Sequence, residues 1–376
     1  MTKLKVPYFE PWITKEDKKK IMKVLDQRWL TNGPMLQKFE DGFRKSIGTK
    51  FAIGVGSATQ ALHLAMRAIN VGEGDEVIVP TFTFAATANA AIYNGAKPIF
   101  VDVDKETFTI VPEKIQNSIN KKTKAIIVVH YGGQACDMDK ILKISKENNI
   151  PIIEDCAHTP GSRYKKKNCG SMGLIGCFSF YATKTITTAE GGMITTNDKN
   201  IEKQIRLLRS QAMNIQAIER EKKAKWKYDI VDLGYNYRLD EIRSALGLSQ
   251  LQRINKIISK RSKIASKYNK HFKNIEGIET PTVKKDRNHT YHLYTIKINK
   301  KYSLTRDELF EKLSKKGIGT SVQYYPLHLM SYYKNKFKIK EKEYQVSNKL
   351  KDDILCLPIF PTMSNKQIDY VMKQIQ

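Results

Sequence analysis

The stretch IPIIEDCAH, residues 150–158, decides the fold class of this chain. It is apolar at its start and then ends in two carboxylates, Glu154 and Asp155. An apolar run without alternation is typical of a strand that is buried on both faces of a sheet. Two similar runs precede it, KPIFVDV at 97–103 and KAIIVV at 124–129, with helical stretches between them. Strands of this type separated by helices predict an α/β domain built on a mostly parallel sheet.

The same alternation extends toward the N-terminus, where FAIGV (51–55) and DEVIVP (75–80) predict two more strands. From about residue 238 the pattern changes to a long helical segment over 239–272 and then to a smaller α+β pattern. A chain of 376 residues with 41% hydrophobic residues suits one large and one smaller domain. We expect a large α/β domain over residues 1–255, including the N-terminal segment, and a small C-terminal α+β domain over residues 256–376.

The composition excludes several classes of protein. No stretch approaches the roughly 18 apolar residues of a membrane span, and the opening MTKLKVPYFEPW lacks the apolar core of a signal peptide. The five cysteines include no C-x-x-C pair, so free thiols are a simpler reading than a disulfide framework or a zinc site. We therefore expect a cytoplasmic protein with no metal site and no membrane partner.

The formal net charge is +27, from 65 Lys and Arg against 38 Asp and Glu. A field of this sign attracts nucleic acid, an anionic membrane or a phosphorylated small molecule. The lysines are scattered, however, and neither a basic stripe with interleaved aromatic residues nor a nucleic-acid motif stands out. We interpret the charge as a lysine-rich solvated surface that favours an anionic substrate rather than nucleic acid.

A single lysine interrupts the stretch CFSFYATKTITTAEGGM at 177–193. Lys184 follows an apolar run and stands among hydroxyl side chains before a Gly-Gly pair. It is either a surface lysine in a loop or a lysine that forms a covalent bond. Asp155 ends another strand, although an Asp there can equally be a cap or a turn residue. A Lys and an Asp at strand ends suit pyridoxal phosphate (PLP), which needs a lysine for its Schiff base and an acid at its pyridine nitrogen.

Two further stretches fit a bound cofactor. GSATQALHLAM (56–66) places small and hydroxyl residues at the start of a helix, where free backbone N–H groups and the helix dipole favour a phosphate. An ordinary N-cap is the alternative for this stretch. TFTFAAT (81–87) follows a strand end, and an aromatic residue there can stack on a flat ring, although a core Phe is the alternative.

These motifs, in this order, resemble the sugar-nucleotide aminotransferases, the DegT-like branch of the fold-type I PLP enzymes. The resemblance covers nearly the whole chain and is closest to the group that aminates carbon 4 of UDP-linked 4-keto-6-deoxyhexoses. It implies a fold-type I architecture with a mostly parallel, seven-stranded type of sheet. The motifs that carry it are WLTNGP (29–34), GSATQALHLAM, PTFTFAATANAAIYNGAKPIFVDVD (80–104), HYGGQACDMD (130–139), EDCAH, FSFYATKTITTAEGGM, DLGYNYRLDEIRSALGLSQL (232–251), YHLY (291–294), YYPLHL (324–329) and LPIFP (357–361).

The resemblance implies a role for each matching residue. Lys184 is expected to form the Schiff base and to shuttle the proton, and Asp155 to bind the pyridine nitrogen. Asn236 is expected to reach the cofactor phosphate of the neighbouring subunit, which predicts a homodimer with shared active sites. The implied cofactor-binding residues are Ser57, Ala58, Thr59, Phe84, Asp155, His158, Ser179, Lys184 and Asn236. The implied substrate-binding residues are Tyr8, Thr31, Asn32, Gln323, Tyr325 and His328.

Three positions depart from the commonest family pattern. Ala58 stands where Gly is frequent in the phosphate motif, which keeps the backbone donor but makes the loop less permissive. Ala189 also stands where Gly is frequent. Gln323 replaces a frequent His near the sugar, and this departure leaves the identity of the substrate open.

The implied reaction is PLP-dependent transfer of an amino group from L-glutamate to the keto carbon, expected at C4, of a nucleotide-linked keto-deoxy sugar. Pyridoxamine phosphate is the expected intermediate, and the expected product is an amino sugar nucleotide for glycan biosynthesis. Amination at C3 and a GDP- or dTDP-linked sugar stay open as alternatives.

Three rival functions follow from the same sequence. A sugar 3-dehydratase of this fold would carry a histidine in place of Lys184. A PLP enzyme acting on amino acids would not need the motifs at 29–34 and 324–329. A non-catalytic DNA-binding regulator is supported by the charge alone.

Overall fold

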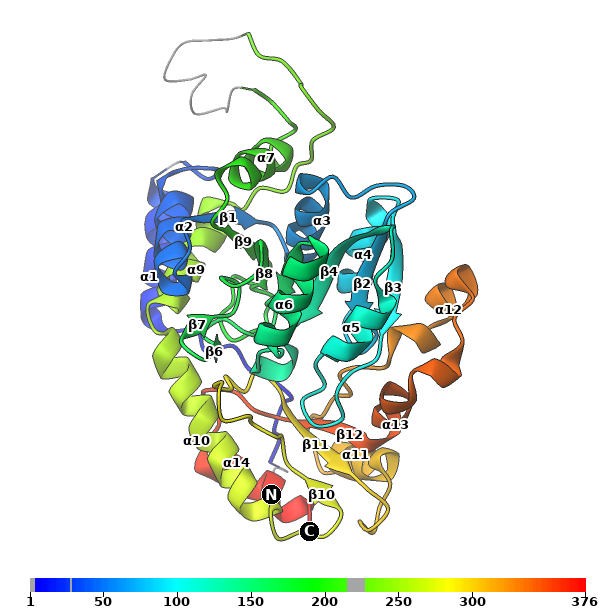
Figure 1. The fold of residues 1–376 in the computed structure, drawn as a ribbon. Coiled ribbons are helices and arrows are strands. Elements are labelled where there is room, and N and C mark those ends of the chain that lie inside the picture. The colour runs from blue at the N-terminus through cyan, green and yellow to red at the C-terminus, as the bar shows by residue number, and fades with distance from the viewer. Residues whose placement is uncertain (1–3, 28, 215–226) are drawn as a thin grey trace.

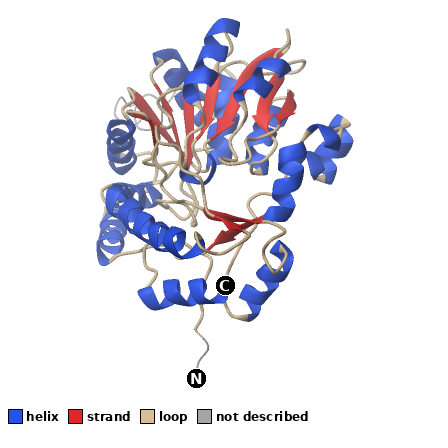
Figure 2. Cartoon of the chain, turned by 60° about the horizontal axis from the view of Figure 1, so that its bottom comes forward, coloured by secondary structure: helices blue, strands red, loops and turns tan. Residues whose placement is uncertain are grey.

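The computed structural model describes residues 4–27, 29–214 and 227–376. A large sheet covered by helices lies above a smaller unit, near which both chain ends are found (Figure 1). Figure 2 shows the strands of the two units as separate sheets. The α/β class with a large, mostly parallel sheet and a smaller C-terminal α+β part is confirmed. The division at residues 255 and 256 stays a prediction, and it falls in the first turn of a helix.

Seven strands of the described residues form the large sheet, in the order β1-β9-β8-β5-β4-β2-β3. All are parallel to one another except β9, which is antiparallel to both of its neighbours. Strand β9 is not predicted from the sequence pattern, because the polar Thr195 and Thr196 break its apolar run. The strands are β1 (Phe51–Val55), β2 (Glu76–Pro80), β3 (Lys97–Val101), β4 (Thr123–Val129), β5 (Ile152–Asp155), β8 (Ile175–Ser179) and β9 (Gly192–Thr196).

Helices cover both faces of this sheet (Figure 1). Ile152 of β5 packs into the core on one face and Ile153 into the core on the other, which explains why this strand is apolar throughout. Helices α2 (Pro34–Ile47), α5 (Pro112–Ser118) and α6 (Met138–Asn148) contribute to the first core. Helices α3 (Ala58–Ala68), α4 (Ala85–Tyr93) and α7 (Lys199–Arg209) contribute to the second.

The predicted long helical segment is two helices, α9 (Glu241–Leu251) and α10 (Ile254–Phe272). The break falls at Arg253, whose guanidinium pairs with Asp17 and donates to the carbonyl of Trp12. These bonds tie the break to the start of α1 (Lys15–Asp26), so a tertiary contact overrides the helical pattern of the sequence.

The smaller unit contains the antiparallel sheet β10-β11-β12 and its own core. Val6 packs into this core and bridges to Ile318, although the sequence analysis grouped the N-terminal segment with the large domain. An apolar side chain at position 6 completes the smaller core, and the chain then passes toward the large sheet. The elements are β10 (Ile278–Glu279), β11 (Tyr294–Ile298), α11 (Arg306–Lys315), α12 (Ser331–Phe337), α13 (Gln345–Asp353), β12 (Ile354–Leu357) and α14 (Asn365–Gln374).

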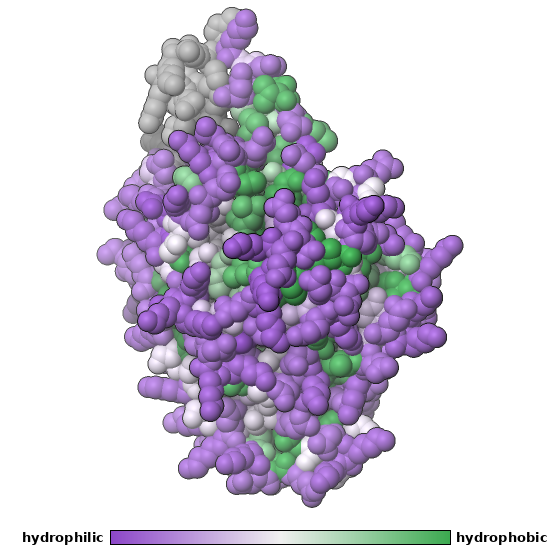
Figure 3. Space-filling model, in the orientation of Figure 1, coloured by the Kyte–Doolittle hydropathy of each residue, from purple (hydrophilic) through white to green (hydrophobic). Residues whose placement is uncertain are grey.

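The remaining elements are short connections, η1 (Tyr131–Gly133), β6 (Arg163–Tyr164), β7 (Lys167–Asn168), η2 (Leu327–Leu329) and η3 (Glu341–Glu343). Hydrophilic residues dominate the face shown in Figure 3, in keeping with the high content of lysine. Among the described residues, no helix has both the length and the apolar character needed to cross a bilayer.

Candidate active site

Hydrogen-bond register aligns the ends of four strands at one edge of the large sheet. Asp155 of β5 pairs with Cys177 of β8, and Ser179 at the end of β8 pairs with Gly192 of β9. Gly192 also pairs with Val55, the last residue of β1. The carboxyl edge of a parallel sheet is where ligands bind in open α/β folds. Residues far apart in the sequence therefore meet at a single edge.

Lys184 lies in the loop that follows β8 and lines a pocket beside this edge. Its backbone N–H donates to the carbonyl of Tyr181 at 2.9 Å, which fixes the loop close to the strand end. Burial lowers the pKa of Lys184 to about 8, while the nearby carboxylate of Asp155 acts in the opposite direction. A neutral amine is the nucleophilic form of lysine, and at this pKa it is well populated slightly above neutral pH.

Asp155 is 5% exposed and accepts two hydrogen bonds, from the N–H of Ala157 at 3.1 Å and from the hydroxyl of Thr87 at 2.9 Å. Because Thr87 donates to Asp155, the hydroxyl of Thr83, 2.9 Å away, must donate to Thr87. Burial raises the pKa of Asp155, and these bonds together with Lys184 oppose the rise. Neither Thr83 nor Thr87 was predicted as a site residue from the sequence, although both stand in the stretch TFTFAAT.

The neighbouring carboxylate, Glu154, points to the other face of the strand and has a structural role. Its oxygens accept from the backbone N–H groups of Gly170, Met172 and Gly173 and from Nε2 of His130. Burial alone would raise the pKa of Glu154, but the hydrogen bonds outweigh it and hold the pKa below its usual range. Of the two acids that end the strand, Glu154 anchors a loop and Asp155 faces Lys184.

His158 is a neutral imidazole in this structure. Its Nδ1 accepts from the N–H of Gly132 at 3.2 Å, so its ring proton is on Nε2 and is donated to the hydroxyl oxygen of Tyr324 at 2.9 Å. Burial and the charge of Lys184 hold the pKa of His158 well below its usual value. The hydroxyl hydrogen of Tyr324 is therefore free to be donated to a ligand. Tyr324 was not singled out from the sequence, although it opens the motif YYPLHL.

The start of α3 is an anion seat. Ser57 caps the helix by accepting from the N–H of Gln60 at 3.2 Å, which leaves the N–H groups of Ala58 and Thr59 without a helical partner. Gly192 approaches this turn so closely that a Cβ on it would lie 2.6 Å from the carbonyl carbon of Ser57 and 2.9 Å from the nitrogen of Ala58. The second glycine of the Gly-Gly pair is therefore required by the contact between β9 and the seat.

Two further predicted cofactor residues lie on the same edge. Phe84 precedes α4 and is 61% exposed, so one face of its ring is open to a ligand. Its ring centroid is 6.2 Å from that of Tyr324. Ser179 is buried and accepts from the N–H of Tyr181 at 3.4 Å. Both residues stay predictions as ligands of the cofactor.

The predicted substrate residues divide into two groups. Gln323 donates to the hydroxyl of Tyr8 at 3.3 Å, and both line a hollow with His292. This hollow shares Phe9 and Thr183 with the pocket of Lys184. Tyr325 is also open to solvent, since it is 47% exposed.

Thr31, Asn32 and His328 lie apart from that hollow. The side-chain oxygen of Asn32 accepts from Arg209 at 3.4 Å, and the carbonyl of Thr31 accepts from Trp29 at 2.7 Å. His328 is completely buried, with Nδ1 2.7 Å from the hydroxyl of Thr81 and Nε2 2.8 Å from Asn348. A substrate contact of His328 would require one of these bonds to break.

Asn236 is exposed and bridges to Ser210 through its backbone. The backbone carbonyl of the adjoining Tyr237 accepts a hydrogen bond from the N–H of Gly56 at 3.1 Å. The segment that carries Asn236 therefore runs beside the anion seat of the same chain, with its side chain directed outward.

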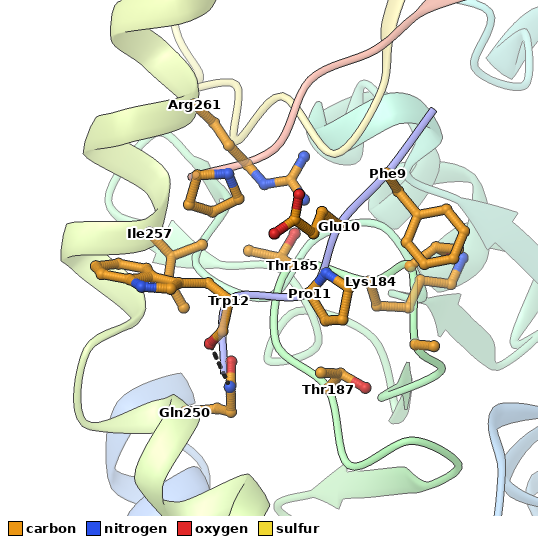
Figure 4. Close-up of a pocket in the computed structure, with 13 residues that line it drawn as sticks. Phe9, Glu10, Pro11, Trp12, Lys184, Thr185, Thr187, Gln250, Ile257 and Arg261 are labelled. Carbon is orange, nitrogen blue, oxygen red and sulfur yellow. Dashed lines mark hydrogen bonds between the residues drawn. The ribbon is translucent and has the colours of Figure 1, made fainter. Parts of the chain in front are cut away.

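The N-terminal segment forms a wall of the lysine pocket (Figure 4). Phe9, Pro11 and Trp12 line the pocket from this segment, and Thr185 lines it from the loop of Lys184. Arg261 reaches in from α10. The N-terminal segment and helix α10 thus enclose the loop that carries the lysine.

Comparison with known proteins gives the family context of this site. The model of the DegT/DnrJ/EryC1/StrS aminotransferase family matches residues 11–376. The chain is 38% identical to the spore coat polysaccharide biosynthesis protein SpsC of Bacillus subtilis, over 99% of this chain and 96% of that protein. It is also 38% identical to GDP-perosamine synthase of Escherichia coli O157:H7, over 98% of this chain and 97% of that protein.

The fold is that of solved sugar aminotransferases. A sugar aminotransferase (Spr1654) of Streptococcus pneumoniae, solved in a PLP form, covers 99% of this chain and 98% of its own with a TM-score of 0.91 and 29% identity. The same protein in its pyridoxamine phosphate (PMP) form has a TM-score of 0.92. The expected PLP cofactor is thereby confirmed.

The residues of this chain fit PLP on their own geometry. The anion seat at Ala58 and Thr59 supplies free N–H donors for a phosphate, and the missing Cβ of Gly192 allows β9 to pack directly against it. Asp155 and Lys184 are close enough for each charge to act on the pKa of the other. A phosphate seat, an acid and a lysine with a lowered pKa are the three groups that this cofactor requires.

Substituting Gly192→Ala should lower the affinity for PLP about tenfold or more, because overpacking costs roughly 1–3 kcal/mol and here displaces the anion seat. Titration of the cofactor-free protein with PLP, followed by absorbance, measures the change. Gly72→Ala is the matched control, since a Cβ at Gly72 would meet no atom within 4 Å. Equal affinities of the two variants would contradict the assigned seat.

The reactivity of Lys184 should rise with pH around the pKa of about 8. As pH rises through that value the amine loses its proton, so acetylation of Lys184 in the cofactor-free protein should follow a curve with this midpoint. Asp155→Asn removes the opposing carboxylate and should move the midpoint lower. Limited acetylation and peptide mass spectrometry give both curves, and a wild-type midpoint above pH 10 would contradict the burial argument.

Proposed function

The chain belongs to the DegT/DnrJ/EryC1/StrS aminotransferase family, and from that premise we propose that it moves an amino group from glutamate to C4 of a nucleotide-linked 4-keto-6-deoxy sugar. The chain is a PLP-dependent sugar aminotransferase. To this activity the proposal adds the identity of the amino donor, the position of the keto carbon and the nucleotide that carries the sugar. The observation that carries it is Lys184, whose pKa is lowered to about 8 and which faces Asp155 beside an anion seat.

The names of two relatives support the amino sugar. One is called a GDP-perosamine synthase, and another a spore coat polysaccharide biosynthesis protein. A product destined for a surface glycan agrees with the second name. The sequence motifs favour a UDP-linked sugar, whereas the first name favours a GDP-linked one, so these two carriers head the candidates. Amination at C3 and a dTDP-linked sugar are the remaining alternatives.

PLP, when bound, supplies an aldehyde that captures amines and a ring that accepts the electron pair of a carbanion. The residues proposed to hold it are Lys184 at the aldehyde, Asp155 at the ring nitrogen and the turn Ser57–Thr59 at the phosphate. Phe84 and His158 flank the ring in this proposal, and Ser179 adds a hydroxyl to the phosphate seat.

The side chains of this protein carry out the proton transfers and position the reacting groups. Neutral Lys184 takes the proton from the α carbon of the donor and later gives a proton to the sugar carbon. A positioned acid or base of this kind contributes roughly 10²–10⁴-fold to a rate. Thr87 and Ala157 hold the carboxylate of Asp155 in place, so the acid does not need to reorient between the two half-reactions. His158 directs the hydroxyl of Tyr324, whose proton is free for donation.

Electrostatics support a phosphorylated substrate. The net charge of +27 attracts anions from solution, and a nucleotide diphosphate is the anionic part of the proposed sugar substrate. The hollow lined by Tyr8, Gln323 and His292 adjoins the lysine pocket and offers polar groups for sugar hydroxyls. Thr31, Asn32, Tyr325 and His328 complete the proposed substrate contacts, of which His328 requires the largest rearrangement.

A homodimer with shared sites is part of the proposal. Asn236 is exposed beside a run of exposed apolar side chains, Ile230, Val231 and Leu233, of which Leu233 is 70% exposed. Exposed apolar runs of this kind favour a subunit contact. A second copy docked there would bring Asn236 to the phosphate of its cofactor.

The function is tested by incubating the enzyme with glutamate and a panel of 4-keto and 3-keto sugars linked to UDP, GDP or dTDP. We expect a 4-amino sugar from a 4-keto substrate, identified by product mass and by NMR. Lys184→Ala should retain the fold, as judged by circular dichroism, and should lose turnover by at least about 10³-fold, as expected when an essential acid–base group is removed. A Lys184→Ala variant with wild-type turnover would contradict the assignment of Lys184. A product aminated at C3 would show that the enzyme acts at C3 and not at C4.

The shared site is tested by subunit mixing. If Asn236 serves the partner's site, a heterodimer of Lys184→Ala and Asn236→Ala chains contains one intact site and one doubly altered site. An equimolar, reassembled mixture should then regain about one quarter of wild-type activity, because about half of the dimers are mixed and each has one intact site. Each variant assayed alone is the control. No gain on mixing would show that each site is built from one chain.

A further inference from the structure

We propose that Arg261 and Thr185 form the seat for a carboxylate of the amino donor. The proposal rests on the proposed transamination and deepens it by assigning residues to the amino acid rather than to the sugar. Both residues line the pocket of Lys184 (Figure 4).

Arg261 is a buried cation without an anion. It is 3% exposed, and its Nη1 donates to the backbone carbonyls of Tyr291, His292 and Ile359 at 3.1, 3.4 and 2.8 Å. Its Nε has no hydrogen-bond partner. No carboxylate of residues 4–27, 29–214 or 227–376 forms an ion pair with it. Buried charges are normally paired, because an unpaired ion in the interior is costly.

Arg209 differs from Arg261 in having an anionic partner, although its Nε is likewise without a hydrogen-bond partner. It is the other fully buried arginine of the described part of the chain, at 4% exposure, and its Nη1 lies 3.0 Å from Glu40. Burial lowers the pKa of Arg261 to about 10, so this side chain is still a cation at neutral pH. The pocket therefore holds a permanent positive charge that protein carbonyls solvate only in part.

Thr185 supplies a second unsatisfied group in the same pocket. Its hydroxyl is buried and has no hydrogen-bond partner. In Figure 4 Thr185 lies next to Lys184 and faces the side from which Arg261 enters. Orphaned polar groups are rare in folded proteins, and two of them on one pocket indicate a polar ligand.

The chemistry of the two groups fits a carboxylate. The Nε and Nη2 edge of a guanidinium presents two parallel N–H donors, which match the two oxygens of a carboxylate. A threonine hydroxyl adds a third donor. The same pocket is lined by Phe9, Pro11 and Pro361, whose apolar side chains can contact the carbon chain of an amino acid.

Glu10 also lines this pocket and makes no ion pair with Arg261. It is exposed, and it belongs to the N-terminal segment. Figure 4 draws its carboxylate on the side of the pocket where Arg261 enters, so a donor carboxylate would take that place and become the direct anionic partner of Arg261.

The test uses the amino-acid half-reaction, which needs no sugar. Conversion of the PLP form to the PMP form by glutamate is followed by absorbance, and binding of glutarate, an unreactive dicarboxylate, to the cofactor-free protein is followed by calorimetry. Arg261→Gln should weaken glutamate and glutarate about 10- to 100-fold, and Thr185→Val about 3- to 10-fold, as expected for lost hydrogen bonds to a charged group. The KM for the keto sugar nucleotide should change by less than about twofold.

Thr185→Val keeps the test decisive if Arg261→Gln does not fold. Its hydroxyl has no partner in the protein, so the isosteric change should leave the melting temperature unchanged while it weakens glutarate. Arg44→Lys, at an exposed ion pair with Asp41, is the control and should change nothing. Unchanged glutarate binding in Thr185→Val, or an equal loss for glutarate and for the sugar nucleotide, would overturn the seat. Failure of every sugar in the panel alongside an intact glutamate half-reaction would overturn the proposed function and leave this seat standing.

Discussion

The hydrogen-bond register across β5, β8, β9 and β1 is the constraint on which the site depends. It sets Asp155 opposite Cys177, Ser179 opposite Gly192, and Gly192 opposite Val55. A slip of one residue in any pair would turn alternate side chains to the opposite face of the sheet. The acid, the hydroxyl and the anion seat would then no longer share an edge, whatever the loops between them did.

The alternation of a strand also divides the work of two adjacent acids. Glu154 and Asp155 are chemically similar neighbours, yet one accepts four hydrogen bonds inside the protein and the other faces a lysine. The first fixes the loop around Gly170 against the strand. The second can interact with a ligand because that loop is already held. Stability and chemistry are thus supplied by consecutive residues of one strand.

Much of this arrangement could be predicted from the sequence. Strands buried on both faces have an unmistakable composition, so β1 to β5 and the α/β class were accessible, and strand ends pointed to Asp155 and Lys184. β9 was not accessible, because its threonines satisfy their hydroxyls against carbonyls of Gly170 and Leu174, partners that lie far away in the chain. Tyr324 and Thr87 were missed for the same reason, since each acquires its role from a partner on another element.

Helix α10 belongs to both cores of the molecule. Ile254 and Ile257 pack with the large sheet, and Ile264, Tyr268 and Phe272 pack with the smaller unit. A helix of this length spans about 28 Å, at about 1.5 Å per residue, and it resists bending because every turn is hydrogen-bonded. The two units are therefore joined by a continuous rigid helix rather than by a flexible linker. Arg261, midway along α10, hydrogen-bonds to carbonyls of the smaller unit and lines the lysine pocket, so the helix holds it at a fixed place between the two units.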